Sequence, residues 1–475
     1  MIQEASYRMP FARILRSSAL MGGAQVVALV AGFVRAKIIA VVFGAAGIGL
    51  IGVLNGFNGN IASFTGWGLA TSGVRVIAGA PETDKPNKIS AVRYLGRQLS
   101  WVGLGIVVLS FWPVGRATFA SDKYTLELAV AGLAVPCLVA SAAWSAILQA
   151  AGRLKTLAKV QVIGAIAGLL IGLPLIYFVG TLGVALSIFL AAAVPAIALW
   201  DDARRHCPTD MAPANESDVR YLLQLGGALM IVGWLAQLSA YVVRLIIIRG
   251  HGLEAAGYYQ ASYAIAGSLP GFVFVAMGVD FFPRISAAKD EAEAAHLAEK
   301  QIQAGLLLGL PLLAGLLTMG RFCLHLLYDD SFDAAIPLLS WMVWGIFLRL
   351  IAWPLGYWLL ARGSASVAVG VETVGNALAI IFPLVLLPLF GLTGAAIGFC
   401  ASYVVYALVM IVVARCRSGI WLGWHTWLSI LVSAGALLLA QLSVSRSEGL
   451  YWGLLPTAVI AICCFLIYRQ AVRHS

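Results

Sequence analysis

The chain has 475 residues, of which 61% are hydrophobic and only 11% charged, and its mean hydropathy is +0.92. Composition this apolar excludes an ordinary soluble globular protein. The formal net charge is +10, but the basic residues fall between apolar segments and form no basic helix or aromatic-interleaved patch, which argues against nucleic acid as a partner. The sequence therefore predicts an integral membrane protein that contacts membrane lipid.

Long apolar segments recur from one end of the chain to the other. A helix needs about 20 apolar residues to cross the hydrocarbon core, and lipid tolerates no unpaired backbone groups, so each segment is expected to be helical. The expected fold is an all-α integral membrane protein with about 14 transmembrane helices. The expected spans are residues 14–42, 47–78, 94–115, 125–150, 159–179, 182–200, 220–248, 257–282, 300–320, 336–361, 366–389, 392–414, 424–441 and 450–468.

The positions of lysine and arginine predict the orientation in the membrane. Most of the 31 basic residues fall in the segments that share a side with the N-terminus, so the positive-inside rule predicts that this side is cytoplasmic. An even number of spans then places both termini in the cytoplasm, and the start of the chain lacks the cleavage site of a signal peptide. The expected outer segments hold Arg116, Lys123, Arg249, Arg321 and Arg446.

The two halves of the chain resemble each other. VRAKII at 34–39 aligns with VRLIII at 243–248, so Arg35 corresponds to Arg244. AAGIG at 45–49 aligns with AAGYY at 255–259, and GTLGVAL at 180–186 aligns with GLTGAAI at 391–397. An internal repeat of this kind predicts two six-helix bundles around a central cavity, with two added C-terminal helices.

The repeat also predicts the domain boundaries. The gaps between spans are too short to form a soluble domain. The expected parts are an N-terminal six-helix bundle at 1–200, a cytoplasmic linker at 201–219, a C-terminal six-helix bundle at 220–415 and two additional helices at 416–475.

Several cations lie inside the expected spans. A charge near the bilayer centre costs at least about 2.5 kcal/mol on insertion scales, so such residues are candidates for a functional site. The matching positions of Arg35 and Arg244 favour a pair that faces the cavity between the bundles. Snorkelling towards the interface is the competing explanation for most of them, and for Arg75 it is equally well supported. The intramembrane cations are Arg35, Lys37, Arg75, Arg244 and Arg349.

Arg349 is the clearest candidate, because it lies midway between Pro337 and Ala361. The rise of its helix places it roughly 18 Å from either end, which is too far for snorkelling to relieve. Two explanations remain. Arg349 lines a polar cavity, or it forms a buried ion pair with Glu372 or Asp280.

Glu372 and Asp280 are the two acids expected inside the membrane. Each is either the partner of an arginine or a site for a coupling proton or cation, and the sequence does not separate these roles. Asn55, Asn58 and Thr65 share one face of the second span, within about 100° of arc. Their amides and hydroxyls form either interhelical hydrogen bonds or a polar wall suited to sugar.

The sequence shows no catalytic constellation. The six histidines are scattered at span ends without a neighbouring nucleophile, and the seven cysteines have no metal-ligand spacing. We therefore expect no catalytic residue, no metal site and no cofactor, and a protein that is not an enzyme.

Four short motifs resemble a known family. AKIIAVVFGAAGIGL at 36–50, GVRVIA at 73–78, VVRLII at 242–247 and EAAGYYQ at 254–260 are similar to the Wzx-type O-antigen and enterobacterial common antigen flippases of the multidrug/oligosaccharidyl-lipid/polysaccharide exporter superfamily. The resemblance implies translocation of undecaprenyl-diphosphate-linked oligosaccharide to the outer face of the bacterial inner membrane. It also implies a polysaccharide polymerase and a chain-length regulator as partners.

The resemblance carries over to individual residues. Lys37, Arg75 and Arg244 fall where these proteins also have a cation, Arg349 where they can have a lysine, and Glu372 where they can have a glutamate. GFVR at 32–35 also resembles the lipid II flippases. A multidrug exporter of the same superfamily would require acids and aromatics around an apolar cavity, whereas cations exceed acids in these spans. A polymerase or ligase of the same pathway is the third, enzymatic alternative, and it would be expected to have a large outer loop, which the predicted spans leave no room for.

Overall fold

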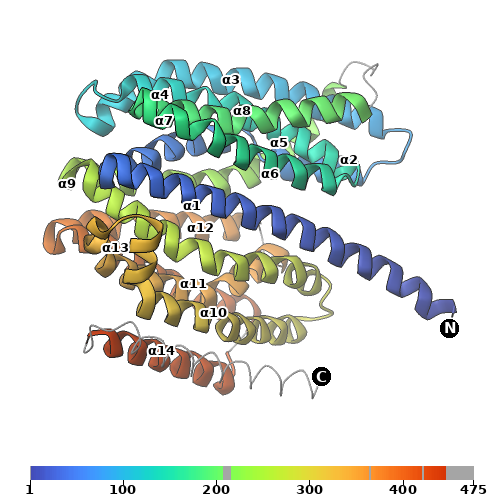
Figure 1. The fold of residues 1–475 in the computed structure, drawn as a ribbon. Helices are drawn as coiled ribbons and strands as arrows, with labels where there is room; N and C mark the ends of the chain where they lie inside the picture. The colour runs from blue at the N-terminus through green and yellow to red at the C-terminus, as the bar shows by residue number, and fades with distance from the viewer. Residues whose placement is uncertain (1, 207–214, 363–364, 420–421, 446–475) are drawn as a thin grey trace. The chain divides into compact units, whose positions relative to one another are not determined.

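The computed structural model describes residues 2–206, 215–362, 365–419 and 422–445. These residues form an all-α protein without strands in the described ranges, and 11 of its segments are long and apolar enough to cross a membrane (Figure 1). The helices are α1 (Ile2–Thr65), α2 (Leu69–Ala78), α3 (Lys85–Phe119), α4 (Thr125–Gly132), α5 (Ala134–Ala150), α6 (Leu154–Leu170), α7 (Gly172–Val179), α8 (Thr181–His206), α9 (Glu216–Ser286), α10 (Glu291–Leu327), the 3-10 helix η1 (Asp330–Ala335), α11 (Ile336–Arg362), α12 (Ala365–Phe390), α13 (Leu392–Ser418) and α14 (Trp424–Ser445).

Two of these helices run through more than one expected span: α1 contains the span 14–42 and the first part of 47–78, which continues into α2, and α9 contains 220–248 and 257–282. Gly44 (φ 62°, ψ −159°) interrupts α1, and Gly252 (φ 86°, ψ 174°) interrupts α9. A positive φ at these points costs glycine little because it has no Cβ, so the chain can bend there. Every expected span up to residue 441 therefore has a helical counterpart, and the protein is a multi-pass membrane protein. The last expected span, 450–468, lies outside the described residues.

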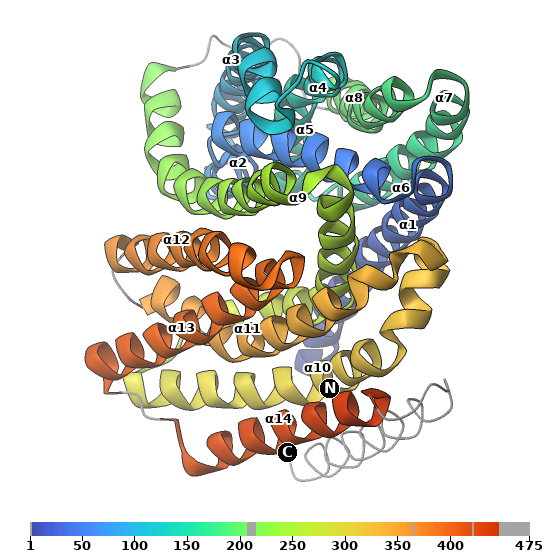
Figure 2. The same ribbon diagram turned by 90° about the vertical axis from the view of Figure 1, so that its left-hand side faces the viewer.

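The chain forms two compact units. Unit 1 comprises Met1–Phe43 and Leu50–Tyr241, and unit 2 comprises Gly44–Gly49 and Val242–Ser475. Within unit 1, α5 packs against α2, α3 and α8, and α6 packs against α8. Within unit 2, α13 lies between α11 and α12, and α14 lies along α10 (Figure 2).

The first part of α9 belongs to unit 1, although the repeat places residues 220–248 in the second bundle. The indole Nε1 of Trp67 donates to the carbonyl oxygen of Leu223 at 2.8 Å, and Asn60 Nδ2 donates to the carbonyl oxygen of Gln237 at 3.1 Å. Packing and sequence repeat thus divide the chain at different residues. The domain ranges based on the repeat stay a prediction.

Matching glycines support the repeat. Gly180 (φ 72°, ψ −140°) precedes α8, and Gly391 (φ 60°, ψ −151°) precedes α13 with nearly the same conformation. A Cβ atom added to Gly183 would lie 1.9 Å from a backbone carbonyl oxygen, and one on Gly394 would lie 2.0 Å from the equivalent oxygen. Both glycines thus permit the same close approach of two helices in each half.

The structure corrects the alignment of the repeat near the bends. Gly44 and Gly252 share the same backbone conformation, and Gly49 and Gly257 both lie against a backbone carbonyl oxygen. Gly49 is therefore the counterpart of Gly257, whereas the sequence alignment of AAGIG with AAGYY pairs Gly47 with Gly257. Alanine and glycine are so frequent here that identity alone misplaced the register by two residues.

Candidate functional site

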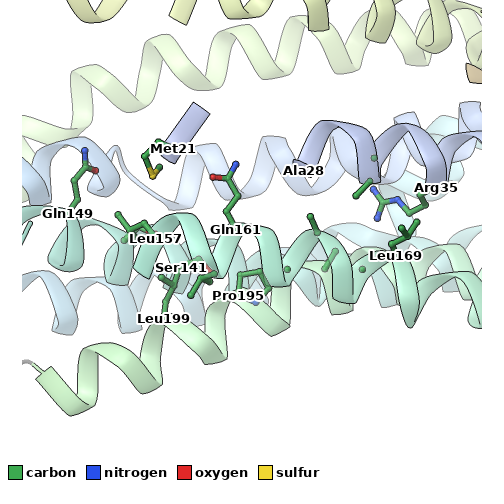
Figure 3. A pocket seen from close by; sticks show the side chains of 18 residues that line it. Met21, Ala28, Arg35, Ser141, Gln149, Leu157, Gln161, Leu169, Pro195 and Leu199 are labelled. Atoms are coloured by element: carbon green, nitrogen blue, oxygen red, sulfur yellow. The ribbon is translucent and has the colours of Figure 1, made fainter. Parts of the chain in front are cut away.

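Unit 1 contains a cavity of about 530 Å³ between α1, α5, α6 and α8. Figure 3 shows Arg35 beside Leu169 at one end of this cavity, Gln161 near its middle, and Met21 and Gln149 towards the other end. Most of the wall is apolar, so the polar atoms that reach it stand in a medium of low dielectric, where a charge interacts strongly.

Arg35 is the only basic residue that lines this cavity in the described part of the chain. No hydrogen bond or ion pair joins its guanidinium to any described residue. Helices of unit 1 line the cavity in which Arg35 lies, and its place in a cavity shared by the two bundles stays a prediction. Lys37 is half-buried, does not line this cavity and interacts with other groups.

Unit 2 contains a second cavity, of about 360 Å³, between the second part of α9, α11 and α13. Gln260, Tyr263, Ser268, Arg349 and Phe399 are among the residues that line it. No acidic side chain is part of the described lining. The cavity is therefore aromatic and cationic.

Arg349 enters this cavity without an ion-pair partner among the described residues. Its Cζ atom lies 4.9 Å from the ring centroid of Phe274, a cation–π contact. No described ion pair joins Arg349 to Glu372, whose Oε1 accepts a hydrogen bond from the Tyr406 hydroxyl at 2.7 Å. The charge of Glu372 still acts on Arg349, so a charge pair between the two stays a prediction. Asp280 lies in α9, but its side chain is outside the described part of the structure.

Arg244 is buried, and it contacts the same cavity indirectly. Its Nε donates to Oε1 of Gln260 at 2.8 Å, and its Cζ lies 5.6 Å from the ring centroid of Tyr263. Arg244 precedes the bend at Gly252, whereas Gln260 and Tyr263 follow it. The arginine thus joins the two parts of α9 within unit 2.

Two residues of the polar face predicted on the second span form hydrogen bonds to backbone carbonyls, Asn58 to another helix and Thr65 within its own helix. Asn58 is 2% exposed and donates to the carbonyl oxygen of Ala131 at 2.9 Å, and Thr65 is 2% exposed and donates to the carbonyl oxygen of Ile61 at 2.7 Å. Neither side chain lines either of these two cavities, and the sugar-binding wall stays a prediction. Asn55 is exposed and also lines neither cavity.

Arg75 lies in the last turn of α2 and is exposed. It lines neither cavity, which agrees with snorkelling towards the membrane surface.

Four polar residues near Arg349 and Arg244 were not among the predicted site residues: Gln260, Tyr263, Tyr403 and Tyr406. Gln260 and Tyr263 are three positions apart, as are Tyr403 and Tyr406, so each pair shares one face of its helix. Polar residues three positions apart inside apolar spans therefore indicated these site residues in the sequence, but a search restricted to charged residues missed them.

Comparisons with known protein sequences identify a matching family and two similar flippases. A family model described as "Polysaccharide biosynthesis protein" matches residues 38–337. The lipid III flippase of Escherichia coli (strain K12) is 23% identical over 412 residues, which cover 83% of this chain and 96% of that protein. The lipid III flippase of Shigella flexneri matches with the same identity and coverage.

Solved structures share the fold. The lipid II flippase MurJ, in an inward closed conformation, superimposes with a TM-score of 0.75 at 15% sequence identity and covers 97% of this chain and 99% of its own. An inward-facing multidrug resistance MATE family transporter of the MOP superfamily gives a TM-score of 0.65 at 15% identity, with 84% and 94% covered. At this identity the likeness establishes the fold alone.

Proposed function

Because the chain belongs to the polysaccharide biosynthesis protein family, we propose that it is a flippase for an undecaprenyl-diphosphate-linked oligosaccharide in the bacterial inner membrane. The observation that carries this proposal is a pair of cations that each line a cavity and form no described ion pair. Arg35 in unit 1 and Arg349 in unit 2 each line a cavity, and neither forms an ion pair among the described residues. The similarity to a lipid III flippase supports a lipid-linked substrate.

The chemistry of a sugar diphosphate linked to lipid matches these cavities. An arginine held in an apolar wall attracts an anion strongly, because little water screens it. Its planar guanidinium can donate two parallel hydrogen bonds to phosphate oxygens. The polyprenyl tail can remain in the bilayer, so only the diphosphate and the glycan require a polar environment.

Transport would proceed by alternating access. The two units would open first to the cytoplasmic side, where the substrate is made, and then to the outer side, where it is released. Two units joined by helices that bend at Gly44 and Gly252 support this mechanism. The proposal retains both termini in the cytoplasm, as the distribution of basic residues predicts.

Glu372 has a distinct part in this proposal. Since it accepts a hydrogen bond from Tyr406 and forms no described ion pair with Arg349, we assign it to coupling by a proton or cation. A polymerase and a chain-length regulator remain the expected partners on the outer side.

A multidrug exporter is the competing function, because the MATE fold is similar. Its organic cations would meet Arg35 or Arg349 in both described cavities. Like charges in a medium of low dielectric repel strongly, which favours an anionic substrate.

The test is a strain from which the gene has been deleted. The proposal predicts that undecaprenyl-diphosphate-linked oligosaccharide accumulates in the inner membrane while surface glycan is lost, and that the wild-type gene reverses both effects. Surface glycan at the parental level in the deletion strain, with no accumulation, would overturn the proposal. Hypersensitivity to cationic drugs as the sole phenotype would support the exporter instead.

A further inference from the structure

The orientation of the Gln260 amide is determined by its neighbour. Arginine can only donate hydrogen bonds, so the atom of Gln260 that faces Arg244 Nε at 2.8 Å is the carbonyl oxygen Oε1. The amide nitrogen Nε2 has no acceptor among the described residues, and Gln260 lines the cavity of unit 2. The two N–H donors of this amide are therefore available to a ligand in the cavity.

Two further groups add donors to the same cavity. Arg349 has five N–H donors and no acceptor, and no described ion pair occupies it, although the charge of Glu372 acts on it. The hydroxyl of Tyr263 has no hydrogen-bond partner in the described ranges and can donate as well. Ser268 differs, because its hydroxyl donates to the carbonyl oxygen of Ala264 and leaves only an acceptor.

We propose that this cavity is a binding site for an oxyanion, in which Gln260, Tyr263 and Arg349 contact the ligand and Arg244 positions Gln260. A group rich in acceptors and negative charge, a phosphate or a carboxylate, satisfies these donors, whereas a neutral sugar hydroxyl leaves the charge of Arg349 unmatched. The volume of about 360 Å³ suits a diphosphate or one acidic sugar. The inference rests on the proposed function, since it names the part of the substrate that unit 2 recognises.

Arg244 acts through other residues. It is 9% exposed and does not line the cavity. It holds Gln260 by a hydrogen bond and lies over the ring of Tyr263 at 5.6 Å. These two contacts are with side chains of the site, so we assign Arg244 a positioning role.

Binding of small anions to the purified full-length protein tests the site without requiring transport. The probes are inorganic diphosphate, glucuronate and glucose, measured by titration calorimetry in detergent. All measurements use an Arg35→Gln background, so that the cation of the unit 1 cavity does not contribute. We expect diphosphate, glucuronate or both to bind, and glucose not to bind. The anion that binds identifies the source of the oxyanion. If neither diphosphate nor glucuronate binds, the proposed site is refuted.

Gln260→Glu is the decisive variant. The new carboxylate can still accept from Arg244, so folding is preserved, but it replaces two donors by a negative charge that faces the anion. We expect binding to weaken at least about tenfold, the equivalent of one charge-assisted hydrogen bond. Tyr258→Phe is the matched control on the same helix, because that hydroxyl donates to Glu254 away from the cavity. Equal affinity in Gln260→Glu and Tyr258→Phe would contradict the proposal.

The positioning role of Arg244 is tested by non-additivity. Arg244→Ala should weaken anion binding when Gln260 is present and add little in a Gln260→Ala background, since residues that act together do not contribute independently. Arg244→Lys should recover part of the affinity because lysine can also donate to Oε1. Full additivity would contradict the positioning role.

Transport assays separate the two proposals. A protein that binds diphosphate through Gln260 but translocates no lipid-linked oligosaccharide would refute the proposed function and retain this site. If the protein translocates lipid-linked oligosaccharide and Gln260→Glu binds anions as well as the wild type does, the proposed function stands and this site is refuted.

Discussion

Gly49 and Gly257 lie reciprocally against backbone that follows the bends of α1 and α9. A Cβ atom on Gly257 would lie 1.8 Å from the carbonyl oxygen of Ala45, and one on Gly49 would lie 2.2 Å from the carbonyl oxygen of Leu253. All four residues belong to unit 2, because Gly44–Gly49 packs there and not with the rest of α1. Equivalent residues of the two repeats thus form a symmetric contact that only glycine permits.

Gly257→Ala should disrupt this contact. A methyl group cannot displace a backbone carbonyl without moving a helix, and overpacking of this kind typically costs about 1–3 kcal/mol. We expect a lower midpoint of thermal unfolding for the purified protein. Gly271→Ala is the matched control on α9, since nothing lies within 4 Å of its added Cβ. Equal midpoints for both variants would contradict the close contact between Gly257 and the backbone of Ala45.

Removal of Arg349 should abolish export without loss of the protein. Arg349→Ala leaves no described acid unpaired, because Glu372 bonds to Tyr406. We expect normal abundance in the membrane, no surface glycan and partial activity for Arg349→Lys, whose point charge still attracts phosphate. Arg321→Ala is the control, since this exposed cation pairs with Asp333 on the surface.

The competing structural role of Arg349 predicts a different pattern. Loss of one member of a buried ion pair typically costs about 3–5 kcal/mol, so abundance would fall and Glu372→Gln would restore it. Recovery of abundance and export in the double mutant would contradict the binding role.

Arg35→Met should stabilise the protein while reducing export. An unpaired cation in an apolar cavity wall is costly, and methionine fills similar space without a charge. The midpoint of thermal unfolding should therefore rise. Arg153→Met in the same unit should do the opposite, because Arg153 pairs with Asp202 at 3.0 Å. A fall in stability for Arg35→Met would indicate a structural partner.

The orientation of the chain can be tested by labelling single cysteines from either side of the membrane. We expect positions 85, 153 and 205 to react from the cytoplasmic side and positions 123 and 329 from the outer side. An inside location for Asp329 would contradict the topology.

The fold could largely be predicted from the sequence, because the length and apolarity of each span depend on local composition. The bends were harder to place. Gly44 and Gly252 were identified as breaks between spans only within several residues, since a glycine-rich stretch offers many possible bend points.

Arg349 was singled out because its depth in the span follows from its position in the sequence. The structure places it at a cavity, and its binding role stays a prediction. The partners of Asn58 and Arg244 could not be predicted, because a hydrogen bond between two helices, or between the two parts of a bent helix, depends on rotation and packing that periodicity does not determine. Gln260 was missed for the same reason: its importance comes from Arg244, on the other side of a bend.

The most direct test of the central claim is translocation by the purified protein in proteoliposomes that contain an undecaprenyl-diphosphate-linked oligosaccharide. An enzyme that modifies the glycan and cannot cross the membrane reports how much substrate has reached the opposite leaflet. The proposed function predicts that substrate crosses with the wild-type protein and not with Arg349→Ala reconstituted in equal amount. Equal crossing in wild-type, Arg349→Ala and protein-free vesicles would contradict it.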